Sequence, residues 1–187
     1  MLIGILGLQG GIEEHEHIFH RLSVSTRRVR TPADLAGLDG LVLPGGESSV
    51  MAKLAEQLGL FNPLQKLIND GLPVFATCAG LILLATKLDN PAPGQKNLAV
   101  VDMVVRRNAF GNQRNSFEHD LEVLGVTMRP TFIRAPEVIS VGAGIDVIAK
   151  IDGRIVGVKQ DKILGLSFHP EQVGDYRLHQ LWLEEIL

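Results

Sequence analysis

The chain has 187 residues, of which 45% are hydrophobic and 21% charged, and its formal net charge is −3. This length predicts one domain over residues 1–187, large enough to bury a core without disulfides or structural metals. The near-neutral charge excludes a strongly basic nucleic-acid-binding protein, and the apolar content excludes a disordered chain. A single cysteine, Cys78, excludes an intramolecular disulfide and a cysteine-rich zinc site, and it favours a reducing cytoplasm.

Two expectations concern membranes. The first residues, Met1–Gln9, are apolar but carry no basic residue and run into glycines, so we expect a buried strand there and not a signal peptide. No apolar run reaches the ~18–20 residues of a membrane span. We therefore expect neither a membrane nor a nucleic acid among the partners, and a cytoplasmic location.

Strands and helices are expected to alternate in the first half. Short apolar runs that end in turn residues predict buried strands, and apolar residues at helical spacing predict helices. The order indicates a three-layer α/β/α fold with a mostly parallel sheet. In chain order the expected elements are a strand at 2–8, a helix at 12–22, strands at 24–30 and 39–43, helices at 48–58 and 61–68, a strand at 73–77 and a helix at 79–88.

The second half reads differently. Short runs of β-type residues predict extra strands, and Asp152-Gly153 predicts a hairpin turn between two of them. A loop is expected at 90–96, where two prolines and a glycine occur. The expected strands are 98–107, 121–126, 131–134, 147–151, 154–160 and 163–168, followed by a closing helix at 178–186.

Cys78 follows a predicted strand and precedes a predicted helix. This is the strand–turn–helix geometry of a nucleophile elbow, with cysteine in place of serine. The small neighbours Ala76 and Gly80 allow the tight turn, and the amide of Ala79 would face an oxyanion formed at the attacked carbon. A lone cysteine is otherwise most often a small core residue.

Most of the six histidines have a plain interpretation. His15, His17 and His20 lie in a charged helical segment, which predicts a solvated face in preference to a metal site. His119 and His179 are also expected at the surface. No metal site is predicted.

His169 is the exception, because it directly follows an apolar strand and begins the sequence His169-Pro170-Glu171. Pro170 is expected to keep His169 extended, and residues two apart on an extended segment point to the same side. Glu171 would then orient the imidazole, which completes a Cys–His–Glu triad. The alternative is an ordinary loop with a hydrogen-bonded histidine.

Two glycine-rich segments also follow strands. The segment 7–11 lacks the spacing of a dinucleotide-binding loop, and the chain contains no P-loop. Segment 44–49, Pro-Gly-Gly-Glu-Ser-Ser, either caps a helix through Ser48 or Ser49, or offers the amides of Gly45 and Gly46 to an oxyanion. In an open parallel sheet both segments would meet at the ligand-binding edge.

Together these segments resemble the class I, triad-type glutamine amidotransferases, and most closely the glutaminase subunits of pyridoxal 5′-phosphate synthase. Ala76 stands where the usual elbow has its first glycine. The resemblance spans nearly the whole chain and rests on 7–10 (GLQG), 43–48 (LPGGES), 77–80 (TCAG), 107–111 (RNAFG), 116–118 (SFE), 132–136 (FIRAP) and 167–171 (SFHPE).

The resemblance implies a flavodoxin-like amidotransferase fold and hydrolysis of L-glutamine to L-glutamate and ammonia through a cysteine thioester. It implies docking on a TIM-barrel synthase subunit, to which ammonia is channelled within a large hetero-oligomer. Pyridoxal phosphate is then the product of the assembly, and the chain itself needs no cofactor.

The resemblance also implies roles for individual residues. Cys78 would be the nucleophile, His169 the general base and acid, and Glu171 the orienting carboxylate. Arg107 rather than its neighbour Arg106 would enter the pocket. The remaining implied positions are glutamine contacts at Gly46, Glu47, Ser48, Arg107, Ile133 and Arg134, an oxyanion hole at Gly46 and Ala79, and partner-coupled activation at Gln9 and Gly10.

Three alternatives stay open. The chain could be the glutaminase subunit of another pathway, such as histidine biosynthesis. It could be an unrelated cysteine hydrolase on a similar sheet. It could also be a subunit that binds and regulates a synthase without catalysis, although the complete set of Cys78, His169 and Glu171 weighs against this.

Overall fold

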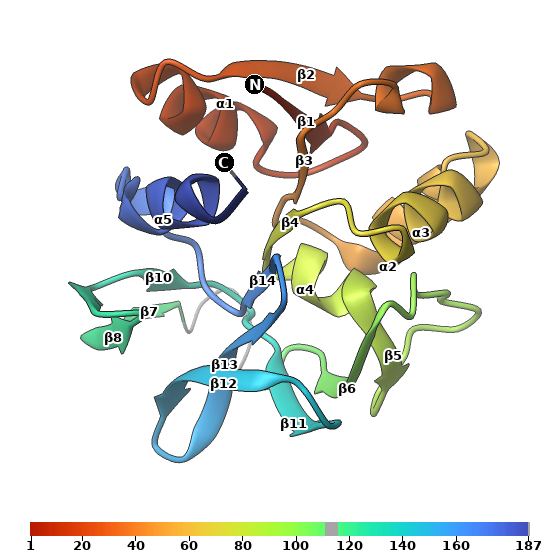
Figure 1. Ribbon diagram of the computed structural model, residues 1–187. Helices are drawn as coiled ribbons and strands as arrows, with labels where there is room; N and C mark the ends of the chain where they lie inside the picture. The colour runs from red at the N-terminus through yellow and green to blue at the C-terminus, as the bar shows by residue number, and fades with distance from the viewer. Residues whose placement is uncertain (111–115, 187) are drawn as a thin grey trace.

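One long sheet runs through the molecule (Figure 1). The computed structural model describes residues 1–110 and 116–186. Within these residues the sheet has ten strands in the order β2-β1-β3-β4-β14-β13-β11-β6-β5, and β12 pairs with β13. The mixed α/β fold with a mostly parallel central sheet, predicted from the alternating pattern, is confirmed.

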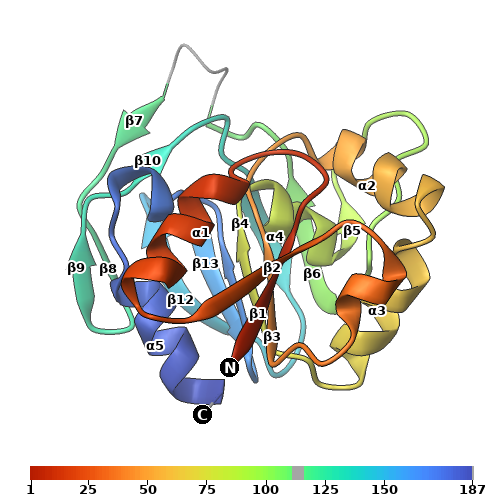
Figure 2. The same ribbon diagram turned by 90° about the horizontal axis from the view of Figure 1, so that it is seen from above.

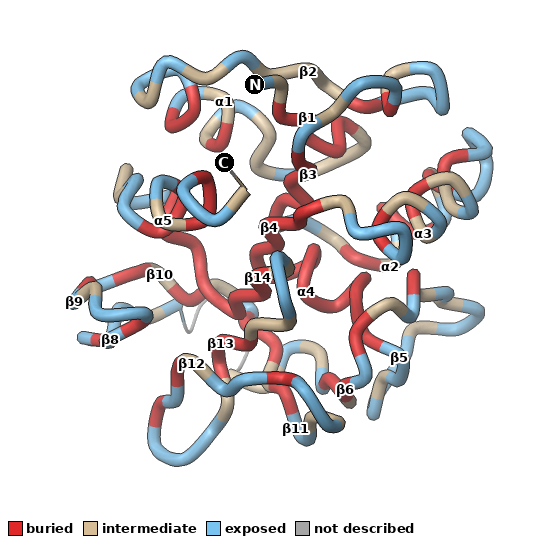
Figure 3. Tube along the Cα trace, viewed as in Figure 1, coloured by how far each residue is buried: buried red, intermediate tan, exposed pale blue. Residues whose placement is uncertain are grey.

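The first part of the sheet is parallel. Its strands are short apolar runs that bury both faces, and β3, β4 and nearly all of β14 are buried (Figure 3). The carboxyl ends of these strands share one edge of the sheet, where the functional segments meet. In spatial order these strands are β2 (Ser25–Val29), β1 (Leu2–Leu6), β3 (Gly40–Leu43), β4 (Val74–Thr77) and β14 (Ile163–Leu166).

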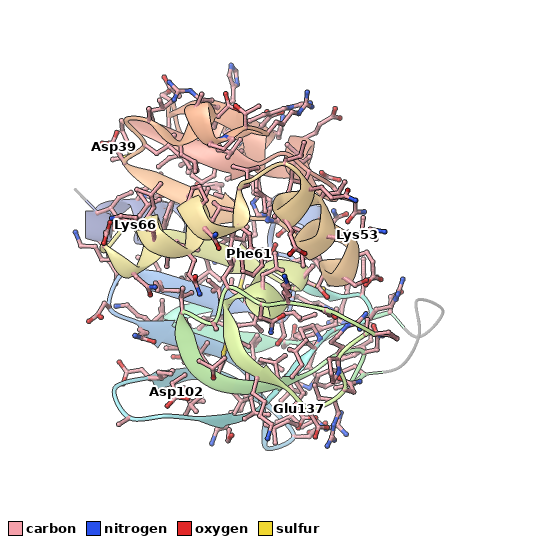
Figure 4. The ribbon with its side chains drawn as sticks, turned by 90° about the vertical axis from the view of Figure 1, so that its right-hand side faces the viewer. Asp39, Lys53, Phe61, Lys66, Asp102 and Glu137 are labelled. Carbon is pink, nitrogen blue, oxygen red and sulfur yellow. The ribbon has the colours of Figure 1, made fainter. Side chains whose placement is uncertain are left out.

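Helices cover both faces of the parallel part. Helices α1 (Ile12–Arg21) and α5 (Arg177–Ile186) lie on one face (Figures 1 and 2). Side chains alternate between the two cores: on β3, Val42 packs toward α1 and α5, while Leu41 and Leu43 pack toward the other side. That second face is covered by α2 (Ser48–Gln57), α3 (Phe61–Asn69) and α4 (Ala79–Leu84), and Figure 4 views it with Lys53, Phe61 and Lys66 labelled.

The second part of the sheet is largely antiparallel. Strands β12 and β13 form the predicted hairpin, and Asp152 and Gly153 take φ values of 48° and 80° in its turn. Strand β11 was missed by the sequence prediction. The strands of this part are β5 (Ala85–Leu88), β6 (Val101–Arg106), β11 (Glu137–Val141), β12 (Asp146–Ile151) and β13 (Arg154–Gln160).

Several sequence expectations were wrong in extent. The strand expected at 98–107 is confined to β6, Val101–Arg106. The helix expected at 79–88 ends at Leu84, and β5 follows because residues 85–88 pair with β6. The strand expected at 121–126 is a hairpin of β8 (Leu121–Val123) and β9 (Val126–Met128). The strand expected at 131–134 stops after β10 (Thr131–Phe132), which pairs with the unpredicted β7 (Phe117–Glu118).

Short 3-10 helices lie at Pro32–Leu35 (η1) and Glu171–Val173 (η3). Among the described residues, no helix is both long enough and apolar enough to cross a membrane.

Candidate active site

A cavity of about 330 Å³ opens where β1, β3, β4 and β14 end. Ligands of open α/β proteins bind at this edge. Two of the predicted residues, Ala79 and Glu171, are buried and do not line the cavity. The other predicted residues all line the cavity: Gln9, Gly10, Gly46, Glu47, Ser48, Cys78, Arg107, Ile133, Arg134 and His169.

Cys78 occupies a strained elbow between β4 and α4. Its φ of 47° and ψ of −98° are unusual for a residue with a side chain, and its N–H donates to the Leu166 carbonyl at 2.7 Å. The helix behind it packs tightly, because a Cβ on Gly80 would lie 2.0 Å from the Leu43 carbonyl oxygen. The tight turn predicted from the small residues is therefore present.

The His169–Glu171 contact forms, but by a different geometry from the one predicted. Pro170 has helical angles, φ −64° and ψ −31°, and Glu171 begins η3. The turn brings Glu171 Oε1 to 2.7 Å from His169 Nδ1. The extended backbone expected through Pro170 is therefore wrong, while the residue before it, His169, bridges to Thr131 as in a strand.

The charges of this pair are coupled. Burial alone would lower the pKa of His169, but hydrogen bonds with Cys78 and Glu171 and the attraction of both groups raise it to about 10. Burial alone would raise the pKa of Glu171, but attraction to the neighbouring imidazoles and the hydrogen bond from His169 lower it to about 2. At neutral pH Glu171 is a carboxylate and His169 an imidazolium. Since Glu171 holds Nδ1, the ring's Nε2 is the atom left to pair with Cys78.

Two arginines converge on Glu47 inside the cavity. Arg107 donates to Oε1 at 3.0 Å and Arg134 to Oε2 at 3.2 Å. Arg106 instead pairs with Asp89 at 2.7 Å outside the cavity, so Arg107 is the arginine that enters it. Paired guanidinium groups are suited to hold a carboxylate.

The backbone around these arginines is held in place. Asn90 accepts the Arg107 N–H at 2.7 Å and donates to the Arg107 carbonyl at 2.9 Å. Arg134 has a positive φ of 47°, and the preceding Ile133 places its carbonyl oxygen 3.8 Å from Cys78 Sγ. The last residue of the 107–111 motif, Gly111, lies outside the described residues.

The loops after β1 and β3 are joined directly. Gln9 Oε1 accepts the Glu47 N–H at 2.6 Å, and the Gly11 N–H donates to the Gly45 carbonyl at 3.1 Å. Gly10 must be glycine here, because a Cβ would lie 1.8 Å from the Gly45 oxygen and its φ is 106°. A movement of residues 9–11 would therefore displace residues 45–47 through these contacts.

Ser48 does not cap α2 through its side chain. It is the first residue of the helix, it is buried, and its Oγ accepts a hydrogen bond from Gln95 Nε2 at 3.0 Å. Ser49 donates instead to Glu47 Oε1 at 3.1 Å. Both serines thus support the cavity wall, and the simple capping interpretation is wrong.

Two histidine expectations were wrong. His15 and His179 are fully buried, whereas His17, His20 and His119 are exposed as predicted. His15 lies three and four residues before the apolar Ile18 and Phe19, and this spacing indicates the buried face of α1.

Sequence reasoning also missed several cavity residues. Glu14, Ile82, Asn108 and Gln172 line the cavity. Asn108 has a positive φ of 50°, to which asparagine is more tolerant than most residues. Among residues 1–110 and 116–186, no group of three or more His, Cys, Asp or Glu side chains is arranged to hold a metal ion.

An elbow cysteine in front of a His–Glu pair, on a sheet covered by helices on both faces, is the architecture of triad-type cysteine enzymes. The model of the SNO glutamine amidotransferase family matches residues 5–187. The chain therefore belongs to the SNO glutamine amidotransferase family, which confirms the family inferred from the sequence motifs.

Relatives agree with this assignment. The chain is 57% identical over 186 residues to the pyridoxal 5′-phosphate synthase subunit PdxT of Corynebacterium diphtheriae, with all of both chains covered. It is 56% identical over 190 residues to the PdxT subunit of Corynebacterium glutamicum, covering 98% of this chain and 95% of that one. A solved glutamine amidotransferase superimposes with a TM-score of 0.92 at 42% identity, and 98% of each chain is covered.

Proposed function

We propose that the chain is the glutaminase subunit of a pyridoxal 5′-phosphate synthase: it hydrolyses L-glutamine and supplies the ammonia for synthesis of the cofactor. The observation that carries this proposal is Cys78 at the elbow, with the His169–Glu171 pair behind it and two arginines across the cavity. The curated relatives named as synthase subunits support the pathway.

The reaction follows from the charges. His169, whose pKa is raised by Glu171 and Cys78, takes the Cys78 proton, and the sulfur attacks the side-chain amide carbon of glutamine as a thiolate. The carbon becomes tetrahedral, and the amides of Gly46 and Ala79 take the oxyanion. His169 then gives its proton to the departing ammonia, which leaves a thioester. Water, deprotonated by His169, attacks the thioester and releases glutamate and the thiolate.

The substrate's amino-acid end meets the two arginines. Arg107 and Arg134 offer paired donors to the α-carboxylate, and Glu47 between them offers a carboxylate to the α-ammonium. Gly46, Ser48 and Ile133 complete the wall around the side chain. An amino acid, which carries both charges, thus fits a site that also contains both charges. A simple ester or amide has no carboxylate to pair with the two arginines.

The ammonia passes to a TIM-barrel synthase subunit in a hetero-oligomer, without a membrane or nucleic acid. The free cysteine Cys78 suits a reducing cytoplasm. Gln9 and Gly10 lie at the cavity and hydrogen-bond or pack against the Gly45–Glu47 loop. A synthase that docks over residues 9–11 would thereby adjust the oxyanion amide of Gly46.

The test is glutamate release from L-glutamine, measured with and without a pyridoxal phosphate synthase subunit. We expect release that rises with the partner and is abolished in Cys78→Ala, while circular dichroism shows that the variant keeps its fold. Full activity in Cys78→Ala would overturn the mechanism. Activity that ignores this partner would keep the glutaminase and overturn the assigned synthase.

A further inference from the structure

A row of buried polar side chains continues behind the triad. His15 Nε2 lies 3.3 Å from Thr77 Oγ1, and Thr77 Oγ1 lies 3.4 Å from Glu171 Oε1. His15 Nδ1 lies 3.0 Å from His179 Nε2. His15 lies on α1, Thr77 at the end of β4 and His179 on α5, and all three are fully buried. Side chains of this kind are rarely buried without a hydrogen-bonding role.

Both histidines in this row are uncharged at neutral pH. Burial lowers the pKa of His15, and burial together with the neighbouring His15 lowers the pKa of His179 to about 3. The His179 ring is stacked on Phe75 with centroids 4.2 Å apart and meets the edge of Phe19. Each neutral ring carries one N–H and one lone pair on its two nitrogens. The tautomers of the two rings therefore decide which atom donates in each hydrogen bond of the row.

Only one direction satisfies the carboxylate. If His15 carries its proton on Nε2, it donates to Thr77, and the Thr77 hydroxyl donates in turn to Glu171 Oε1. His179 then donates from Nε2 to His15 Nδ1, which leaves its own Nδ1 with a lone pair and no unpaired N–H. Among the described residues, His179 Nδ1 and Glu171 Oε2 are the atoms of these four side chains that have no hydrogen-bond partner. In the opposite direction the Thr77 hydroxyl would donate to His15 Nε2, so Glu171 Oε1 would lose this donor and face a His15 lone pair 3.7 Å away. An N–H of His179 would also be buried without an acceptor.

We propose that His15 is a positioning residue of the triad, which acts through Thr77 on Glu171 and is itself held in its tautomer by His179. The row ends on Oε1, the oxygen that accepts the Nδ1–H of His169 at 2.7 Å. The row fixes the position of this oxygen and stabilises its negative charge, and Glu171 in turn orients the His169 ring beside Cys78. The inference deepens the proposed function, and its kinetic test rests on that function.

Other titratable groups surround the row, and a pH experiment has to include them. Glu171 faces His15 and His169, while Cys78 pairs with His169 from the elbow. Glu14 on α1 acts on His15, and Asp175 before α5 acts on His179. None of these surrounding groups is changed in the variants below except where stated.

The first test does not depend on glutaminase activity. Cys78 is the only cysteine, so the rate of alkylation by iodoacetamide, measured against pH, reports the ionisation of this one thiol. His15→Leu removes the donor, and we expect the midpoint of the profile to rise by about one pH unit. His15→Gln keeps an N–H at the same reach and should restore most of the shift. His17→Leu, on the exposed face of the same helix, is the matched control and should not move the profile.

Thr77→Val provides a second route if His15→Leu fails to fold, which near-ultraviolet circular dichroism would reveal. It keeps the β-branched shape in β4 and removes only the hydroxyl that links His15 to Glu171. We expect a shift in the same direction. Profiles of folded His15→Leu or Thr77→Val that superimpose on the parent profile would overturn the proposal.

The second test is kinetic, with the synthase partner present. His15→Leu should lower kcat about tenfold and leave KM within about twofold, because His15 does not line the cavity. In a Glu171→Gln background the same change should add almost nothing, since its route to the imidazole is already broken. If the losses of kcat from His15→Leu and Glu171→Gln multiply in the double variant, the proposal that His15 acts through Glu171 is overturned. An inactive parent enzyme would instead overturn the proposed function and leave the alkylation test standing.

Discussion

Arg106 and Arg107 are neighbours in the chain, yet they serve different surroundings. The Arg106 side chain is 48% exposed and pairs with Asp89, whereas the Arg107 side chain is 14% exposed and reaches Glu47. The difference arises because Arg106 ends β6 and Arg107 starts the loop that Asn90 clamps. Arg106 is therefore a surface charge, whereas Arg107 places its charge in the cavity.

Arg107→Ala should raise KM for glutamine by about 10- to 100-fold, the range expected when a charged hydrogen bond to the substrate is lost. The value of kcat should change little, because the α-carboxylate is bound equally in the ground state and the transition state. Steady-state kinetics with Arg106→Ala as the matched control test this. An equal rise of KM in both variants would show that the effect comes from the loss of one positive charge and not from the contact of Arg107 with the substrate.

Glu171 should also govern stability in acid. Its folded pKa of about 2 lies below the ordinary 4.5, so the unfolded chain takes up a proton first as the pH falls. The stabilisation is complete above pH 4.5 and is lost between about pH 4.5 and 2. The gap in unfolding free energy between the parent and Glu171→Gln should therefore narrow over that window, measured by urea denaturation at several pH values. A gap that widens toward pH 2 would contradict this assignment.

At the residue scale, the sequence was informative wherever the chemistry is local. Cys78 and His169 each stand directly after an apolar run, so their place at the sheet edge follows from the chain itself. Helical spacing places His15 on the apolar face of α1, but the meeting of His15 with His179 could not be derived in that way. It depends on the packing of α1 beside α5 on one face of the sheet, and this tertiary contact is not encoded in the local sequence pattern.

At the element scale, α4 is the helix on which the elbow depends. Its Gly80 packs against the backbone of β3, at a distance that leaves no room for a methyl group. Close packing here keeps the elbow of Cys78 fixed to the neighbouring strand. The helix itself is only six residues long, so this contact rather than its own hydrogen bonds holds it in place.

Gly80→Ala should lower the free energy of unfolding by about 3 kcal/mol, at the upper end for an overpacked core, and should also lower kcat because Cys78 is displaced. Gly37→Ala is the control: its methyl group meets no neighbour within 4 Å, and only its positive φ of 70° costs about 1 kcal/mol. Chemical denaturation and the glutaminase assay measure the two effects. A kcat loss in Gly37→Ala as large as in Gly80→Ala would contradict the role of the close contact.

The sequence placed most elements of the parallel half but failed at the boundary of α4. Residues 79–88 are rich in leucine and alanine, and intrinsic propensity favours a helix throughout. Pairing with β6 outweighs that preference: Thr86 donates to the Met103 carbonyl at 3.2 Å, and Lys87 lies opposite Val104. A partner strand more than ten residues away leaves no trace in local periodicity.

At the scale of the whole molecule, β14 joins the two parts of the sheet. It pairs in parallel with β4, for example Ile163 with Val74, and antiparallel with β13. The two cores lie on opposite faces of the same sheet, so neither can be lost without exposing the strands between them. We propose that residues 1–187 unfold as one domain.

Urea unfolding should therefore give one transition with the same midpoint by two probes. Trp182, the only tryptophan, reports the core beneath α1 and α5, and far-ultraviolet circular dichroism reports the strands of both parts. An earlier phase seen by circular dichroism, while Trp182 fluorescence stays unchanged, would show that the antiparallel part unfolds separately.

The solitary position of Cys78 also determines how the molecule responds to oxidants. Oxidation of a cysteine first gives a sulfenic acid, and this chain has no second thiol with which to close a protective disulfide. The oxidised sulfur sits at the base of a cavity of about 330 Å³, which a small thiol can enter. Recovery therefore depends on small reductants from outside the protein, and prolonged exposure carries the sulfur on to irreversible sulfinic acid.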